Sequence, residues 1–258
     1  MEIHVDLVPP AAADHDAPAA SLDPTTSSGV ASVVIDVLRG GTVAVTLFER
    51  GAGAVTITSG VRAARKVAER LGAVLVGERD GVPPEGFNHG SSPSLLRRVD
   101  FASREVVLLA RETPVALARA TGTVWLAALN NAVETAKAVL ATRPATVRLV
   151  CAGDRGEPDL ADTVAAGLLV ALLDRGARLD AGLDVRLHGG ARYCLSVLRT
   201  TKDPLDGIWA SAAGAELRAL GLEEDLAVAS ETASSDVVLR VLEGETVMGH
   251  PAVRLRSA

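Results

Sequence analysis

The sequence predicts an α/β protein of the three-layer α/β/α type, in which helices cover both faces of a mostly parallel central sheet. Short runs rich in valine, leucine and alanine alternate with helical patterns between residues 30 and 176. Repeated strand–helix units of this kind form parallel sheets covered by helices. Hydrophobic residues make up 48% of the 258 residues but aromatic residues only 2%. The core is therefore aliphatic, which suits the layers between a sheet and its helices.

The individual elements follow from the spacing of apolar residues. Strands are expected where apolar residues alternate or run without a break, at 3–8, 30–38, 54–58, 73–76, 104–110, 123–129 and 145–153. Helices are expected where apolar residues recur every three or four positions, at 42–50, 59–72, 113–121, 131–142 and 159–176.

The pattern weakens after about residue 185. Two helical stretches are expected, at 190–199 and 208–220. Three short apolar segments follow them, at 225–230, 237–244 and 251–256. We expect a less regular C-terminal α+β extension here, within a single α/β domain over 1–258. Two packed lobes, about 1–185 and 186–258, are the alternative. Residues 9–29 are rich in Pro, Ala, Ser and Asp, which is typical of a mobile loop or insertion.

Charge and hydropathy exclude several classes of partner. The net charge is −6, the pI is about 5.4 and basic residues do not cluster, so nucleic acid is not an expected partner.

Mean hydropathy is +0.27, but the most apolar run, 164–173, is too short to cross a bilayer. The N-terminus lacks signal-peptide character, and two cysteines do not make a disulfide framework. We expect a soluble cytoplasmic protein without membrane contact, and a homodimer as the commonest kind of assembly.

Three polar segments directly follow expected strands. They are 36–42, 77–93 and 151–162, and they carry most of the candidate binding groups. Ligands of open α/β sheets bind beyond the carboxyl ends of the strands. We therefore expect the three segments to share one site at the rim of the sheet.

Each polar residue also has a structural interpretation. Asp36 is suited to capping the next helix, and Asp159 and Asp162 fit the first turn of a helix, where carboxylates are favourable. Cys151 at a strand end resembles a small core residue. His89 in a glycine-rich loop fits a solvated side chain. Taken singly, none of these residues specifies a function.

Together, the three segments resemble motifs of the 2-phosphosulfolactate phosphatase family. The stretches are "DVLRGGT" (36–42), "GERDGVPPEGFNHGSSP" (77–93) and "CAGDRGEPDLADTVAAG" (151–167). Their order and spacing are similar to those of the family over about residues 30–175. "GLEEDL" (221–226) is similar to a late segment of the same family.

The resemblance implies a Mg²⁺-dependent phosphatase of coenzyme M biosynthesis that hydrolyses 2-phospho-3-sulfolactate, a small anionic phosphorylated substrate. Carboxylates are the hard oxygen ligands that Mg²⁺ prefers, and arginines and backbone N–H groups bind anions. The implied metal ligands are Asp36, Glu78 and Asp162, which together with Cys151 are the implied catalytic residues. The implied substrate-binding residues are Arg39, Gly40, Gly41, Thr42, Arg79, Asn88, Gly90, Ser91, Ser92 and Gly153.

The chain departs from the family pattern in one loop above all. Where the family has Thr-Thr-Asn-Gly-Thr, residues 110–114 read "ARETP". Glu112 repels an anion, and Pro114 has no N–H to donate. Asn88, Ser91 and Ala161 also replace family Asp, Asn and Glu residues.

The alternative is therefore a catalytically silent relative that binds a small anion or serves as an assembly subunit. A nucleotide-dependent dehydrogenase is less favoured, because "GAGAV" (51–55) lacks the full glycine motif.

Overall fold

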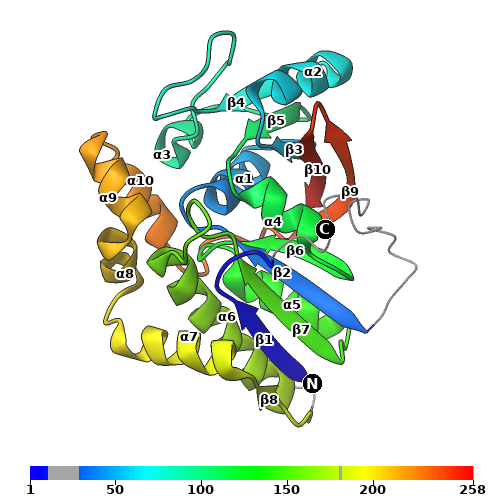
Figure 1. Cartoon of the computed structure of the whole chain (residues 1–258), viewed down its shortest axis with the longest axis vertical. Coiled ribbons are helices and arrows are strands. Elements are labelled where there is room, and N and C mark those ends of the chain that lie inside the picture. The colour runs from blue at the N-terminus through cyan, green and yellow to red at the C-terminus, as the bar shows by residue number, and fades with distance from the viewer. Residues whose placement is uncertain (11–28, 180–181, 258) are drawn as a thin grey trace.

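The computed structural model of the chain describes residues 1–10, 29–179 and 182–257. Most of the expected loop at 9–29 therefore lies outside the described residues. The described residues form one ten-stranded sheet with the order β4-β5-β3-β10-β9-β6-β2-β7-β1-β8 (Figure 1). Its strands are β1 (Glu2–Asp6), β2 (Val30–Ile35), β3 (Ala54–Thr58), β4 (Val74–Gly77), β5 (Glu105–Leu109), β6 (Thr123–Ala127), β7 (Thr146–Cys151), β8 (Arg186–Leu187), β9 (Leu239–Val247) and β10 (His250–Ser257).

The sheet consists of two parallel groups joined by an antiparallel hairpin. Strands β4, β5 and β3 form one parallel group, and β6, β2, β7, β1 and β8 form the other. Between the groups, β10 pairs with β3 and β9 pairs with β6, both antiparallel. The predicted mostly parallel sheet is confirmed. The last two strands of the C-terminal extension, however, lie in the middle of the sheet.

The hairpin sets the relative direction of the two groups. Three antiparallel pairings separate β3 from β6, so the groups run in opposite directions along the sheet. Neighbouring strands twist by about 20–25°, and five pairings lie between β5 and β2. By this estimate, the accumulated twist reduces the angle between β5 and β2 from 180° to about 55–80°. The segments that follow strands of both groups line one cavity.

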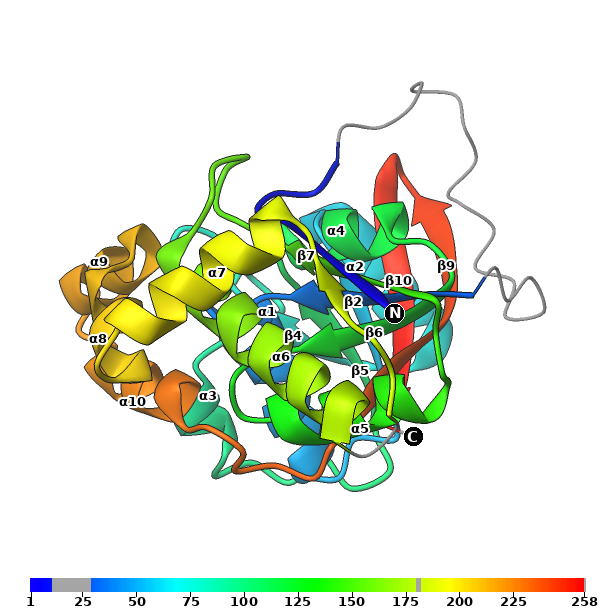
Figure 2. The same cartoon turned by 90° about the horizontal axis from the view of Figure 1, so that it is seen from below.

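Helices cover both faces of the sheet (Figures 1 and 2). Val33 and Ile35 of β2 pack against the layer of α5 (Ala132–Ala141), α6 (Leu160–Leu179) and α7 (Gly189–Thr200). Val34, on the opposite face, packs with α1 (Gly40–Glu49) and α4 (Thr113–Arg119). Because both faces of β2 are buried, its sequence is apolar without alternation.

The α1–α4 layer lies between the two parallel groups. Val34 of β2 and Ile57 of β3 belong to the same apolar cluster as Leu47 of α1 and Leu117 of α4. On the other side of the β3–β5 group, α2 (Val61–Leu71) packs Val67 against Val107 of β5. The predicted strands and helices of residues 30–176 are present, with ends that differ by a few residues.

Four short helices complete the described structure: α3 (Pro93–Leu96), α8 (Pro204–Ala210), α9 (Ala212–Ala219) and α10 (Glu223–Ser230). Residues 225–230, a short apolar segment of the expected α+β extension, are helical. Three acidic residues in the first turn of α10 favour this helix. Among the described helices, none combines the length and the hydropathy that crossing a membrane requires.

The inserted hairpin provides the first prediction. Leu255 of β10 is fully buried and pairs with Val55 of β3 and Val241 of β9. We expect Leu255→Ala to lower the free energy of unfolding by about 2–5 kcal/mol, because the truncation leaves a cavity between the two groups. Urea denaturation measures this loss. The control is Leu242→Ala on β9, where the side chain is 39% exposed and the expected cost is about 0.5 kcal/mol. Equal losses for the two variants would contradict the role given to the hairpin.

Candidate functional site

The main cavity lies where the segments after β2, β4, β5 and β7 meet. Its volume is about 460 Å³, which is within the usual range for small-ligand sites. Helix α9 forms one wall through residues from Ala213 to Leu220. The charged lining residues are Asp36, Arg39, Glu78, Arg79, Asp80, Arg111, Glu112, Asp154, Arg155 and Glu216. The three polar segments of the sequence thus share one pocket, as their positions after strands predicted.

Asp36 is the buried carboxylate of this pocket. It follows β2 and is 7% exposed. One carboxylate oxygen accepts a hydrogen bond from the backbone N–H of Gly40 at 3.0 Å, and the other accepts one from the hydroxyl of Thr113. A Cβ atom on Gly40 would lie 1.9 Å from the Thr113 hydroxyl oxygen. A glycine at position 40 therefore lets the start of α1 and the start of α4 close around Asp36.

Asp162, in the first turn of α6, joins two of the polar segments. Its carboxylate accepts hydrogen bonds from the backbone N–H of Val37 at 2.8 Å and of Gly153 at 3.0 Å. The side chain is buried and does not line the pocket. Asp162 therefore fixes the backbones that follow β2 and β7 relative to each other.

Burial raises the pKa values of three neighbouring acids, Asp36, Asp159 and Asp162. Burial, opposed by the hydrogen bonds from Thr113 and Gly40, raises the pKa of Asp36 to about 6. Burial and the charge of Asp36 raise the pKa of Asp162 well above its usual range. Burial also raises the pKa of Asp159, which caps α6 by accepting a hydrogen bond from the N–H of Ala161. This part of the site therefore favours either a proton or a cation.

Arg39 connects the first polar segment to two others. Its guanidinium forms an ion pair with Glu78, which follows β4, and a second ion pair with Asp225 of α10, at 2.9 Å. The Arg39 side chain is 6% exposed and that of Asp225 is fully buried. Such a buried charge is tolerated only when paired and hydrogen-bonded. Arg39 therefore acts mainly as a bridge beneath the pocket.

Asp225 is a site residue to which the sequence analysis gave no role. Its second carboxylate oxygen accepts hydrogen bonds from the hydroxyls of Ser92 and Ser94, both at 2.7 Å. Its signal in the sequence is the "GLEEDL" segment (221–226), which resembles a late segment of the family. The three-dimensional contact explains why an acid far along the chain belongs with the 77–93 loop.

The 77–93 loop contributes contacts of different kinds. Glu78, Arg79 and Ser91 line the pocket. Asn88 does not; its side-chain oxygen accepts a hydrogen bond from the N–H of Leu75, at 2.8 Å, and so holds the loop against β4. Ser92 caps the short helix α3. Gly90 does not line the pocket. A Cβ atom added at Gly90 would lie 3.4 Å from the side chain of Pro83.

Besides Arg39, three arginines line the cavity. Among the described residues, the Arg79 guanidinium donates one long hydrogen bond, 3.4 Å, to the carbonyl of Ser59 and forms no ion pair. Arg111 lies 4.0 Å from Asp80 and 3.8 Å from Asp154. Arg155 pairs with Glu216 at 2.6 Å. Arg79 and Arg111 are therefore the guanidinium groups most available to an anion.

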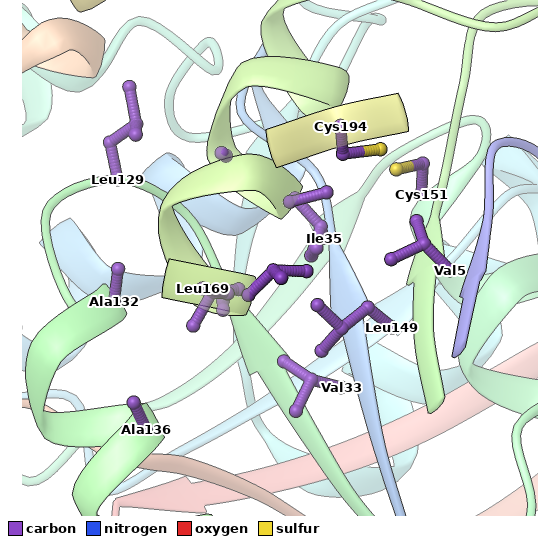
Figure 3. Close-up of a cluster of buried hydrophobic side chains, with 14 of the residues drawn as sticks. Val5, Val33, Ile35, Leu129, Ala132, Ala136, Leu149, Cys151, Leu169 and Cys194 are labelled. Atoms are coloured by element: carbon purple, nitrogen blue, oxygen red, sulfur yellow. The ribbon is translucent and has the colours of Figure 1, made fainter. Parts of the chain in front are cut away.

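Other predicted site residues lie apart from the cavity. Cys151 is in the apolar core, where its sulfur points toward that of Cys194 on α7 (Figure 3). Burial raises the pKa of the Cys151 thiol well above its usual value. Thr42 is buried and donates to the carbonyl of Val37 at 2.8 Å, and Gly41 donates to the carbonyl of Asp36. Gly40 and Gly153 do line the pocket.

The predicted metal ligands do not converge on one point. Asp162 already binds two N–H groups, and Glu78 pairs with Arg39. In the part of the chain that the structure describes, Asp36, Glu78 and Asp162 do not form a cluster of three ligand atoms. The three-carboxylate site thus does not fit a single ion. A Mg²⁺ ion bound through Asp36 does fit, because this ion is often held by one carboxylate, water and substrate oxygens.

Comparison with known proteins adds an independent finding. Residues 18–244 match the model of the family described as 2-phosphosulpholactate phosphatase. A probable 2-phosphosulfolactate phosphatase of Deinococcus radiodurans is 37% identical over 229 residues, which cover 87% of this chain and 92% of the relative. A protein of the same description from Thermus thermophilus is 33% identical over 84% of this chain and 90% of the relative. One from Thermotoga maritima is 30% identical over 76% and 82%.

The raised pKa of Asp36 gives a prediction for stability. The protonated form of Asp36 stabilises the fold below pH 3.8, and this contribution is lost as the pH rises through about 6. We expect Asp36→Asn, measured with EDTA present, to be more stable than the wild type at pH 8 by about 1–3 kcal/mol. The difference should shrink toward pH 4. The control Asp236→Asn, at an exposed position, should show no such trend. An Asp36→Asn protein that is less stable at pH 8 would contradict the burial argument.

Proposed function

The chain belongs to the 2-phosphosulfolactate phosphatase family, and from this premise we propose that it hydrolyses 2-phospho-3-sulfolactate to sulfolactate and inorganic phosphate. The observation that carries the proposal is the pocket itself. A buried carboxylate, Asp36, lines the same cavity as Arg79 and Arg111. A phosphate monoester that also carries carboxylate and sulfonate needs this combination of a reactive centre and cationic groups.

Arg79 and Arg111 are proposed to bind the negatively charged groups of the substrate. Both line the cavity, and neither has a close ion pair among the described residues. The planar guanidinium binds phosphate, carboxylate and sulfonate oxygens through two parallel N–H groups. Arg39 has a different role in the proposal, because Glu78 and Asp225 already occupy its guanidinium. It positions the segments that carry the substrate-binding groups.

Mg²⁺ dependence is part of the proposal, with Asp36 as the residue that would hold the ion. When bound, Mg²⁺ neutralises phosphate charge and activates an oxygen nucleophile. Thr113 and the N–H of Gly40 orient the Asp36 carboxylate. Asp162 holds the backbone at Val37, next to Asp36, and at Gly153 in place. Thr113 is thus a functional hydroxyl within the loop that departs from the family pattern.

Pro114 of the same loop is compatible with this role. It lies in the first turn of α4, where a missing N–H removes no helical hydrogen bond. Glu112 favours the alternative of a silent, anion-binding relative, because it lines the pocket and adds negative charge. Its carboxylate accepts a hydrogen bond from the N–H of Arg155 at 3.2 Å, which directs it toward the 153–157 turn.

Phosphate release from 2-phospho-3-sulfolactate tests the proposal. We expect release by the wild type with MgCl₂ and none with EDTA. Asp36→Asn should lower the rate by about 100-fold or more, because it removes the carboxylate of the reactive centre. The control Asp236→Asn changes the same residue type away from the pocket and should retain the wild-type rate.

Two results would reject the enzymatic assignment. One is a folded wild-type protein that releases no phosphate with Mg²⁺ present, which supports the silent relative. The other is full activity in a folded Asp36→Asn protein, which removes Asp36 from the reaction.

A further inference from the structure

A second cluster of ligand-type side chains lies at the edge of the sheet, away from the pocket. Glu2 and His4 occupy alternate positions of β1 and so share one face. Strand β8 pairs with β1, with Glu2 opposite Arg186, and the N–H of His188 donates to the carbonyl of Ile3 at 3.0 Å. The register therefore places His188 beside Glu2 and His4. None of the three residues lines the main cavity.

The distances within this cluster match the spacing of metal ligands. One carboxylate oxygen of Glu2 lies 3.7 Å from Nε2 of His4 and 3.6 Å from Nε2 of His188. One ligand atom from each residue lies within 4.8 Å of the other two. Zinc bonds of 2.0–2.2 Å at tetrahedral angles put ligand atoms about 3.3–3.5 Å apart. The two distances from Glu2 therefore exceed this spacing by only a few tenths of an ångström.

The three groups do not satisfy one another by hydrogen bonding. The separations of 3.6 and 3.7 Å exceed the hydrogen-bond range. Nε2 of His188 is buried and has no hydrogen-bond partner among residues 1–10, 29–179 and 182–257. The other oxygen of Glu2 faces Arg186 at 3.7 Å, so the oxygen near the two imidazoles is left for a further partner.

From these observations we propose that Glu2, His4 and His188 bind a Zn²⁺ ion. Two imidazoles and one carboxylate are typical ligands of Zn²⁺, and three protein ligands leave a fourth position for water. The imidazole rings stack with centroids 3.7 Å apart and an angle of 18° between them. Binding one ion requires a ring rotation that turns both Nε2 atoms toward it. Both side chains are about one-third exposed, so this rotation has room.

The bound ion would fasten β1 to the segment that leads into α7. His188 is the residue immediately before α7, and β8 contributes only two residues to the sheet. Such a short edge strand has few backbone hydrogen bonds to hold it. A ligand that binds only the folded state raises stability, so Zn²⁺ is expected to raise the melting temperature.

Zn²⁺ titration of the full chain, first stripped of metal with EDTA and then dialysed, tests the proposal. Calorimetry should show one equivalent bound in the presence of MgCl₂, and Zn²⁺ should raise the melting temperature. His4→Gln and His188→Gln should each weaken binding by tenfold or more and lose the thermal shift. The matched control His250→Gln changes a histidine that lies outside the cluster and should bind as the wild type does.

Two outcomes would overturn the proposal: no stoichiometric binding by the wild type, or equal binding by the wild type and His188→Gln. Circular dichroism in EDTA checks that each variant is folded. Anomalous diffraction at the zinc edge provides a test without variants. A peak between the three side chains supports the site, and a peak elsewhere or no peak refutes it.

Discussion

The structure of the pocket depends on one buried guanidinium. Arg39 lies between Glu78 and Asp225, and Asp225 in turn holds the hydroxyls of Ser92 and Ser94. These contacts join the segment after β2, the loop after β4 and helix α10. Because an isolated charge is costly at this depth, each member needs the others. Arg39 thus links segments that are up to 186 residues apart in the chain.

A second constraint acts on the other side of the pocket, where acids accumulate without enough cations. Asp36, Asp159 and Asp162 are buried near one another, and burial raises all three pKa values. Such an arrangement reduces stability at neutral pH. It is understandable in a site that binds a cation or moves a proton, because functional sites often retain destabilising charge. Fold and proposed activity therefore place opposing demands on Asp36.

The sequence predicted the strand–helix alternation well, because β2 and its neighbours are apolar on both faces and leave clear runs. It also placed Asp36, Glu78 and Gly153 at one rim. It did not predict that β9 and β10 enter the middle of the sheet, because strand pairing over such separations has no local pattern. The contacts of Asp225 were not predicted either, because they also join residues that are far apart in the sequence. Cys151 follows the strand rule but faces the core, because adjacent strand residues point to opposite faces.

The most direct test of this account is a double-mutant cycle between Arg39 and Asp225, using Arg39→Gln, Asp225→Asn and the double variant in urea denaturation. A bridge of the kind described predicts a coupling energy of at least about 1.5 kcal/mol. Arg39→Gln leaves the buried Asp225 carboxylate without a cation, and Asp225→Asn leaves the Arg39 guanidinium with Glu78 alone. Additive effects, with coupling below about 0.5 kcal/mol, would show that the two residues do not depend on each other. The bridge would then not organise the pocket.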